Sequence, residues 1–353
     1  MIAEHAETME LSRRLPTQTG SQVVTRLLGL ALCSSILLVV VFCSLAFGAK
    51  SIPLSHVWDA IVHYDSTSND HLIIRSLRMP RTIVGVMVGA ALGLAGAIMQ
   101  GVVRNPLADP GLLGINAGAA LFVVIGISSF GVGSLIGYVW FAFFGAAATS
   151  LVVYVLGSTG RGGATPTKLA LAGAAITAML GSITTAILLT DQSALDTFRF
   201  WAVGSLAGRS STIAWQVLPF IAVGTIIALA CGPILNALAL GDDVARSLGM
   251  KVGVARVMSA FAIMLLCGGA TAAAGPLAFI GLITPHIARV FTGPDYRWIL
   301  PYSMVLAPAI LLGSDVVGRL VVRPGELQVG IVTALIGAPM FIFLVRRKKM
   351  GGL

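Results

Sequence analysis

Ten apolar runs follow one another along the chain, separated by short segments rich in polar residues, glycine and proline. A helix of about 20 apolar residues is long enough to cross the hydrocarbon core of a membrane. We therefore predict an all-α, polytopic membrane protein whose helices cover residues 24–47, 81–103, 112–130, 135–157, 168–190, 213–235, 256–274, 277–291, 298–318 and 327–345. The eighth run is short and only Gly275-Pro276 separates it from the seventh, so a tight reversal and a broken helix both fit.

The second run carries a stripe of glycines on one helix face. Gly85, Gly89 and Gly93 recur at every fourth position, which leaves a smooth strip where the backbone of another helix can approach closely. The run then ends in a polar segment with two prolines, residues 104–114. Because irregular polar backbone at membrane depth survives only inside protein or beside a wet cavity, we expect a packed helix that leads into a shaped turn.

The composition excludes an ordinary soluble protein. Hydrophobic residues make up 57% of the chain and charged residues 10%, compared with about 25% charged residues in a typical soluble domain. The four cysteines all lie within apolar runs and lack the spacing of a metal site or a disulfide framework, so we predict neither. The N-terminal segment carries Glu4, Glu7 and Glu10 before Arg13 and Arg14, and the first run is too long for a cleavable signal peptide.

Three segments outside the spans have a helical pattern. Residues 53–63 are amphipathic and lie in the largest loop of one face, and residues 195–209 precede the sixth run. Phe200 and Trp201 are suited to the headgroup region, so we predict a short interfacial helix there. The loop at 236–255 contains helix-forming residues, an acidic pair and a following glycine, which predicts a short capped helix.

Lysine and arginine are distributed unequally between the two faces. With ten spans and the N-terminus inside, one face carries fifteen of the 23 Lys and Arg residues, which predicts that both termini lie in the cytoplasm. The other face nevertheless carries eight cations, more than orientation alone favours: Lys50, Arg75, Arg78, Arg81, Arg199, Arg209, Arg319 and Arg323. This excess needs an explanation other than membrane orientation.

Several chemistries lack their motif in this chain. The sequence has no P-loop of the form GxxxxGKS or GxxxxGKT, so we predict that the chain does not itself bind ATP in that way. His286 has no histidine or glutamate at metal-ligand spacing and is better explained by a hydrogen bond at a helix end. Asp315 lies well inside a predicted span and is a functional candidate, although an ion pair with Arg319 explains it equally well. No chain of acidic residues crosses the predicted membrane, which argues against a proton or sodium relay.

Distinctive motifs lie in separate segments of the chain. They read Arg78-Met-Pro-Arg81, Gly89-Ala-Ala-Leu-Gly-Leu-Ala-Gly96 with Gln100, Arg104-Asn-Pro-Leu-Ala-Asp-Pro-Gly-Leu-Leu-Gly114, Leu171-Ala-Gly173, Trp201-Ala-Val-Gly-Ser205, Gly275-Pro-Leu-Ala-Phe-Ile-Gly-Leu-Ile-Thr-Pro-His286 and Gly325-Glu-Leu-Gln-Val-Gly-Ile-Val-Thr-Ala-Leu-Ile-Gly-Ala-Pro339. These motifs resemble the FecCD-type permease subunits of type II ABC importers, a family that moves iron–siderophores, haem and cobalamin. The resemblance covers roughly residues 24–346.

The resemblance implies an architecture and a set of partners. The fold would be that of a cobalamin-importer permease with ten helices, paired with a second permease subunit as a homodimer or a heterodimer. Two cytoplasmic ATPase subunits would bind ATP and Mg²⁺, and an extracytoplasmic substrate-binding protein would deliver the ligand. The chain itself would be no enzyme and would hold no cofactor or metal. It would lie among lipids of the bacterial inner (cytoplasmic) membrane, without a nucleic-acid partner.

The resemblance also implies roles for residues on the cytoplasmic side. The turn after the second span would form a cytoplasmic gate at Asn105, Pro106 and Leu107. The loop between the sixth and seventh spans would form the coupling helices, at about 238–252, that insert into the ATPase. The positions expected to contact the ATPase are Leu238, Gly241, Asp242, Asp243, Ala245, Arg246, Leu248 and Gly249.

On the outer face, the resemblance implies that the binding protein docks on Arg78, Arg81 and Arg319. All three belong to the excess of outer cations, although contact with headgroup phosphates would also explain them. The expected domain limits are a cytoplasmic tail at 1–23, a transmembrane permease domain at 24–346 and a cytoplasmic tail at 347–353.

Other functional classes lack support in the sequence. A secondary transporter or channel would need coupling-ion carboxylates or a filter motif, and neither is visible. A membrane enzyme would need a catalytic set of polar residues at membrane depth, which is also missing from the sequence. Within the importer family, ferric siderophores are the expected substrates, and haem and cobalamin stay open as alternatives.

Overall fold

The computed structural model describes residues 20–48, 50, 52–159, 165–323 and 325–350, and these residues form helices and turns without a strand. The long helices are α2 (Gly20–Ala46), α5 (Met79–Val103), α6 (Ile115–Phe130), α7 (Leu135–Ser158), α8 (Pro166–Thr190), α10 (Ser211–Ala230), α13 (Val252–Ala274), α15 (Tyr296–Val321) and α16 (Val329–Met350). The shorter helices are α3 (Leu54–Val62), α4 (Asn69–Leu72), α9 (Gln192–Ala202), α11 (Gly232–Ala239), α12 (Asp242–Ser247) and α14 (Ile280–Thr292). A π-helical turn, η1 (Ile73–Arg78), precedes α5, and a 3₁₀ turn, η2 (Pro110–Leu113), precedes α6.

Each of the ten predicted apolar runs is helical in the structure. Seven helical segments within the described residues are long and apolar enough to cross a membrane: α2, the segment from α4 to α5, α7, α8, α10, α13 and α15. Two shorter apolar helices, Ile115–Phe130 and Val329–Phe343, correspond to the third and tenth runs. The fold is therefore the predicted all-α, multi-pass membrane architecture.

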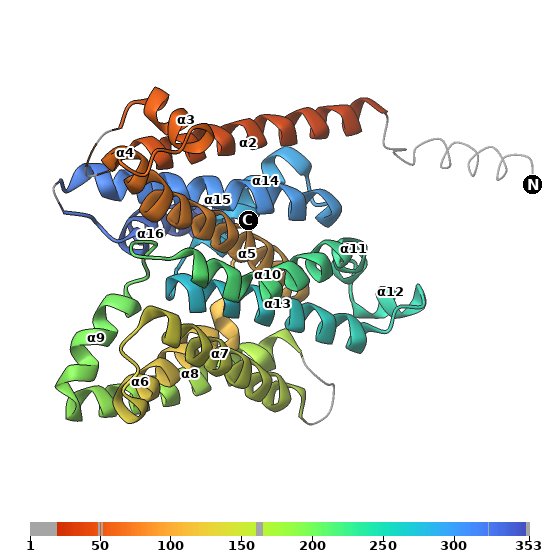
Figure 1. The fold of residues 1–353 in the computed structure, drawn as a ribbon. Helices are drawn as coiled ribbons and strands as arrows, with labels where there is room; N and C mark the ends of the chain where they lie inside the picture. Colours follow the sequence, from red (N-terminus) through yellow and green to blue (C-terminus); the bar gives the residue numbers. More distant parts are fainter. Residues whose placement is uncertain (1–19, 49, 51, 160–164, 324, 351–353) are drawn as a thin grey trace, which may run out of the picture.

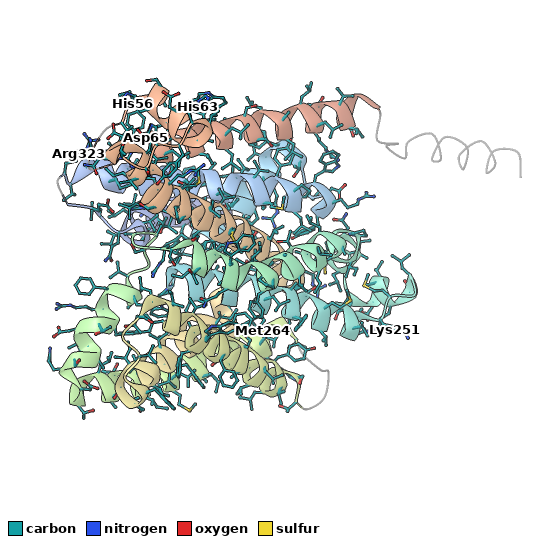
Figure 2. The ribbon with its side chains drawn as sticks, viewed as in Figure 1. His56, His63, Asp65, Lys251, Met264 and Arg323 are labelled. Atoms are coloured by element: carbon teal, nitrogen blue, oxygen red, sulfur yellow. The ribbon has the colours of Figure 1, made fainter. Side chains whose placement is uncertain are left out.

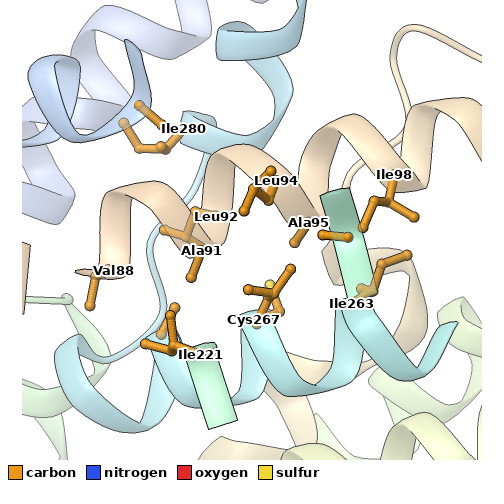
Figure 3. Packing of buried hydrophobic residues seen from close by; sticks show 14 of the residues in the cluster. Val88, Ala91, Leu92, Leu94, Ala95, Ile98, Ile221, Ile263, Cys267 and Ile280 are labelled. Carbon is orange, nitrogen blue, oxygen red and sulfur yellow. The ribbon is translucent and has the colours of Figure 1, made fainter. Parts of the chain in front are cut away.

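Helix α5 lies at the centre of the molecule, between a group formed by α2, α14, α15 and α16 and a group formed by α6, α7 and α8 (Figure 1). It packs against α15 on one side and against α10 and α13 on the other. Figure 3 shows this core, in which Ala91, Leu94 and Ile98 of α5 lie close to Ile263 and Cys267 of α13. Because most of α5 is buried, its apolar character serves protein packing more than lipid contact.

The glycine stripe of α5 faces another helix, as predicted. A side chain at Gly85 would collide with Leu312 of α15, and one at Gly93 would collide with the carbonyl oxygen of Ser303. A Cβ atom at Gly89 would lie 2.5 Å from the Cα atom of Pro308. The missing side chains therefore let the backbones of α5 and α15 approach closely, which is the packing expected of small residues in a membrane.

Two predicted elements differ from the structure. The sixth run is not one helix, because the chain breaks at Cys231 between α10 and α11. The predicted interfacial helix ends at Ala202 instead of residue 209, and Trp201 is buried in the core instead of facing headgroups. The break expected at Gly275-Pro276 is present: the seventh and eighth runs are separate helices, α13 and α14, Gly275 between them has a φ of 80°, and α14 packs against α5 and α15.

The helices run between two ends that carry different elements. Helices α3, α4 and α9 lie at one end, here called the α9 end, where Figure 2 labels His56, His63, Asp65 and Arg323. Helix α12 lies at the opposite end, the α12 end, together with the start of α2 and with Lys251 (Figures 1 and 2). The predicted N-terminal tail lies almost wholly outside the described residues, and α16 extends beyond the predicted limit at residue 346.

Candidate functional site

The predicted gate is a tight, hydrogen-bonded turn at the α12 end of α5. The helix ends because Arg104 has a positive φ of 54°, while its amide still donates to the carbonyl oxygen of Gln100. The Asn105 side chain then accepts a hydrogen bond of 3.0 Å from the amide of Leu107, and the amide of Ala108 donates to the carbonyl oxygen of Asn105. Asparagine favours this local bonding, so the turn is built by its own sequence.

The last turns of α5 are also tied to α14. The Gln100 side chain donates to the carbonyl oxygen of Leu282 at 3.0 Å and accepts from the Arg289 guanidinium at 2.7 Å. Arg289 donates further to the Tyr296 hydroxyl, at 3.2 Å. A movement of α14 would therefore be transmitted to the residues that precede the gate turn.

The predicted coupling segment forms one short helix, α12, after the end of α11. Ala245 of this helix is buried, whereas Val244 and Leu248 are apolar and exposed. Gly241 and Gly249 border the helix and have φ values of 106° and 83°, a backbone region that favours glycine. The segment is therefore a short helix bordered by glycines that exposes two apolar side chains, which suits contact with another protein.

Asp242 links α12 to the end of α5 and to α13. Its carboxylate accepts two hydrogen bonds from Arg256, at 2.8 and 3.0 Å, and lies 3.4 Å from the Arg104 guanidinium. Arg246 approaches the same carboxylate at 3.8 Å. Asp243 by contrast has a fully exposed side chain and pairs with Arg246 alone among the described residues. Asp242 is thus the residue that joins the predicted coupling segment to the predicted gate.

At the α9 end, two arginines bind the end of α2. The Arg78 guanidinium donates to the carbonyl oxygens of Leu45, at 2.7 Å, and Ala46, at 2.6 Å. Arg319 donates to the carbonyl oxygens of Ser44, at 3.0 Å, and Phe47, at 2.9 Å. The last carbonyls of a helix have no partner within the helix, so these arginines cap α2 and hold it against α5 and α15.

Asp315 lies at the centre of a buried ion cluster. It is fully buried and accepts two hydrogen bonds from Arg81, at 2.8 and 3.0 Å, in addition to the predicted ion pair with Arg319 at 3.0 Å. Arg81 also pairs with Glu326 at 2.7 Å. Two parallel bonds from one guanidinium make this a strong and geometrically specific contact.

The three arginines predicted to dock a binding protein therefore lie together, but each of them is buried. Their exposed fractions are 6% for Arg78, 9% for Arg81 and 2% for Arg319. All three border a cavity of about 600 Å³ at the α9 end. Their docking role stays a prediction. In the structure, the three arginines join α2, α5 and α15.

Known proteins resemble this chain along most of its length. Residues 36–347 match the FecCD transport family. The chain belongs to this family. It is 45% identical to the ferric enterobactin transport system permease protein FepD of Escherichia coli strain K12, across 95% of this chain and 99% of that protein. It is 40% identical to the iron(3+)-hydroxamate import system permease protein FhuB of Bacillus subtilis strain 168, across 99% of this chain and 93% of that protein.

The fold is similar as well. A metal-chelate type ABC transporter solved in an inward-facing conformation matches with a TM-score of 0.77 at 27% identity, across 91% of this chain and 98% of that one. In this member of the FecCD family, the turn after α5 and the short helix α12 lie where the sequence predicted them, and Arg78, Arg81 and Arg319 lie around one cavity. The bonds of Gln100 to α14, the role of Asp242 as a link and the pairing of Arg81 with Asp315 were not predicted from the sequence. Each of these joins residues from different helices, and a single sequence does not reveal such contacts.

Proposed function

We propose that the chain is the membrane-spanning permease subunit of an ATP-driven importer of ferric siderophores. The observation that carries this proposal is the 45% identity to a ferric enterobactin permease over nearly the whole of both chains. The multi-pass fold, with α5 buried at its centre, provides the membrane domain that such an importer needs. The proposed location is the cytoplasmic membrane of a bacterium, with both termini in the cytoplasm.

The proposed energy source is a pair of separate ATPase subunits that bind ATP and Mg²⁺. The segment at 238–252 would contact them, through Leu238, Gly241, Asp242, Asp243, Ala245, Arg246, Leu248 and Gly249. The exposed apolar side chains of Val244 and Leu248 support this contact, because a short projection gains affinity mainly by burying such groups. Leu238 and Ala245 are themselves buried, so their part in coupling would be to hold the segment in place.

The proposed transport path lies between this chain and a second permease subunit, with Asn105, Pro106 and Leu107 closing it on the cytoplasmic side. Helices α8 and α16 expose large apolar side chains, which supports their contact with lipid or with the second subunit. An extracytoplasmic binding protein would release its chelate at the α9 end. Arg78, Arg81 and Arg319 would contribute positive charge to that surface, from within the walls of the cavity.

An uptake assay tests the substrate. A deletion strain would be supplied with purified ferric siderophores, haem and cobalamin, and complemented with the wild-type gene. We expect complementation to restore uptake of at least one ferric siderophore and to leave haem and cobalamin uptake unchanged. Restoration of haem or cobalamin uptake alone would contradict the proposed substrate class, but it would still be consistent with an importer.

A further inference from the structure

Two cavities at the α9 end meet at one arginine. Arg209 follows the turn after α9 and lines both a cavity of about 600 Å³ and a second cavity of about 590 Å³. The first is bordered by Arg78, Arg81, Arg319 and Glu326, and the second by residues of α7 and α9. Together with Ala207, the arginine therefore lines both a cavity bordered by charged side chains and one bordered by aromatic side chains.

The Arg209 guanidinium is buried but incompletely bonded. The residue is 5% exposed, and its Nε atom donates to the carbonyl oxygen of Ser205 at 3.0 Å. Its two terminal nitrogens have no hydrogen-bond or ion-pair partner among the described residues. A guanidinium carries five donor N–H groups, so most of the donors of Arg209 are left for a ligand in the cavities. Burial lowers the pKa of Arg209 to about 10, and the group therefore stays charged at neutral pH.

The surrounding charges do not neutralise Arg209. Lys50 pairs with Asp70, at 2.6 Å. Arg81 pairs with Asp315 and Glu326, and Arg319 pairs with Asp315. Arg78 is held by backbone carbonyl groups, which carry no full charge. Arg209 and Arg78 thus contribute two positive charges without a carboxylate partner in the described structure.

The second cavity adds aromatic walls and further donors. It is lined by Tyr138, Phe200 and Trp201, and its one carboxylate, on Asp196, is paired with Arg199 at 3.3 Å. The Tyr138 hydroxyl and the Trp201 indole nitrogen are buried without a partner among the described residues. A ligand with anionic oxygens attached to flat or apolar groups would complement such a compartment.

We propose that Arg209 is the primary cation of an anion-binding site at the α9 end, which receives the carboxylate or catecholate oxygens of an iron chelate. This inference rests on the proposed function, because it specifies a charge class among ferric siderophores. The unpaired guanidinium would give the chelate charge-assisted hydrogen bonds as it enters the path. A lipid phosphate offers the same anionic oxygens and is the competing occupant.

Uptake kinetics of the complete transporter in cells test the site. The probes are a negatively charged ferric tris-catecholate, ferric citrate and a neutral ferric trihydroxamate. We expect R209Q to raise the KM of the anionic chelates by about tenfold, the value of one lost charge-assisted hydrogen bond, and to leave the KM of the neutral chelate unchanged. R209K should restore part of the affinity. R75Q, which removes an exposed cation at the same end of the molecule that lines neither cavity, should behave as wild type.

The outcomes separate the inference from the proposed function. If the wild type imports no ferric chelate, both the anion site and the proposed function are wrong. Two results would rule out the anion site without affecting the proposed importer. The wild type could import only neutral chelates, or R209Q could impair uptake of neutral and anionic chelates equally at matched membrane abundance. If the wild type imports only anionic chelates, a rise in KM with unchanged kcat that R209K reverses supports the site, and a loss of kcat alone overturns it.

A lipid occupant gives a different result. In that case R209Q would leave every KM unchanged and would lower the thermal stability of the complex only in nanodiscs that contain anionic lipid. We expect instead that the stability difference between wild type and R209Q is the same in neutral and anionic nanodiscs.

Discussion

Among single residues, Asp315 lies at the centre of the buried ion cluster at the α9 end. This fully buried carboxylate binds Arg81 from α5 and Arg319 from its own helix, and these arginines in turn contact Glu326 and the end of α2. Removing one member of a buried ion cluster is costly because it leaves the other charges desolvated and unpaired. The carboxylate therefore holds three separate parts of the chain together at the α9 end.

We predict that Asp315→Asn destabilises the protein by about 3–5 kcal/mol, since two buried guanidinium groups lose their shared carboxylate. Thermal unfolding of the purified protein in nanodiscs measures the effect. Asp196→Asn is the matched control, because Asp196 and Arg199 form an exposed pair whose loss should cost less than about 1 kcal/mol. Equal stability of the two variants would show that the cluster does not hold the helices together.

At the scale of helices, the contact between α5 and α15 should be sensitive to a single methyl group. A Cβ atom at Gly89 would lie 2.5 Å from the backbone of Pro308, which cannot move without shifting α15. We predict that Gly89→Ala destabilises the protein by about 1–3 kcal/mol, the usual cost of overpacking. Gly313→Ala on α15 is the control, since a Cβ atom there meets no described atom within 4 Å. A lower melting temperature for Gly313→Ala than for Gly89→Ala would refute the proposed packing.

The link between α12 and the gate turn gives a prediction about coupling. Asp242→Asn weakens the bonds to Arg256 and Arg104, so ATP-driven movement of α12 should no longer reach the end of α5 efficiently. In the reconstituted transporter, we expect ATP hydrolysis to persist while uptake per ATP falls by about tenfold, as for one lost charge-assisted bond. Asp243→Asn, which removes an exposed neighbouring carboxylate, should keep the wild-type ratio. The idea fails if both variants show the same ratio.

The helices and the packing face of α5 could be predicted because they depend on local pattern. Apolar run length gives the spans, and the four-residue spacing of Gly85, Gly89 and Gly93 gives the face that meets α15. The burial of Trp201 could not be predicted, because the pattern of α9 shows an amphipathic helix without showing which element covers its apolar side.

The candidate site could be predicted only in part, for the same reason. The turn at Asn105 is formed by neighbouring residues, so its position followed from the sequence. The pairing of Arg81 with Asp315 joins residues that are 234 positions apart, and the sequence offered the nearer Arg319 as a sufficient partner. Arg209 was counted among the outer cations, but only the folded chain shows that it has no carboxylate partner among the described residues and lines two cavities.

At the scale of the whole molecule, the gate prediction concerns two copies of the membrane domain. If Asn105 and Leu107 close the path between two permease subunits, cysteines at these positions in both subunits should crosslink in the resting state and block uptake. The experiment requires a background in which Cys33, Cys43 and the other two native cysteines are replaced. Crosslinking should be lost in the nucleotide state that opens the path inward. Equal crosslinking in every nucleotide state would make the turn a fixed structural element.

Reconstitution tests whether this chain imports a ferric siderophore with energy from a separate ATPase. Radioactive iron bound to a siderophore would be supplied to proteoliposomes containing the permease, with the partner ATPase and the binding protein present or omitted. We expect uptake only when both partners and ATP are present, and no ATP hydrolysis by the purified permease alone. Uptake driven by an ion gradient without ATP, or ATP hydrolysis by the permease in preparations free of the ATPase, would show that the chain is not the permease subunit of an ATP-driven importer.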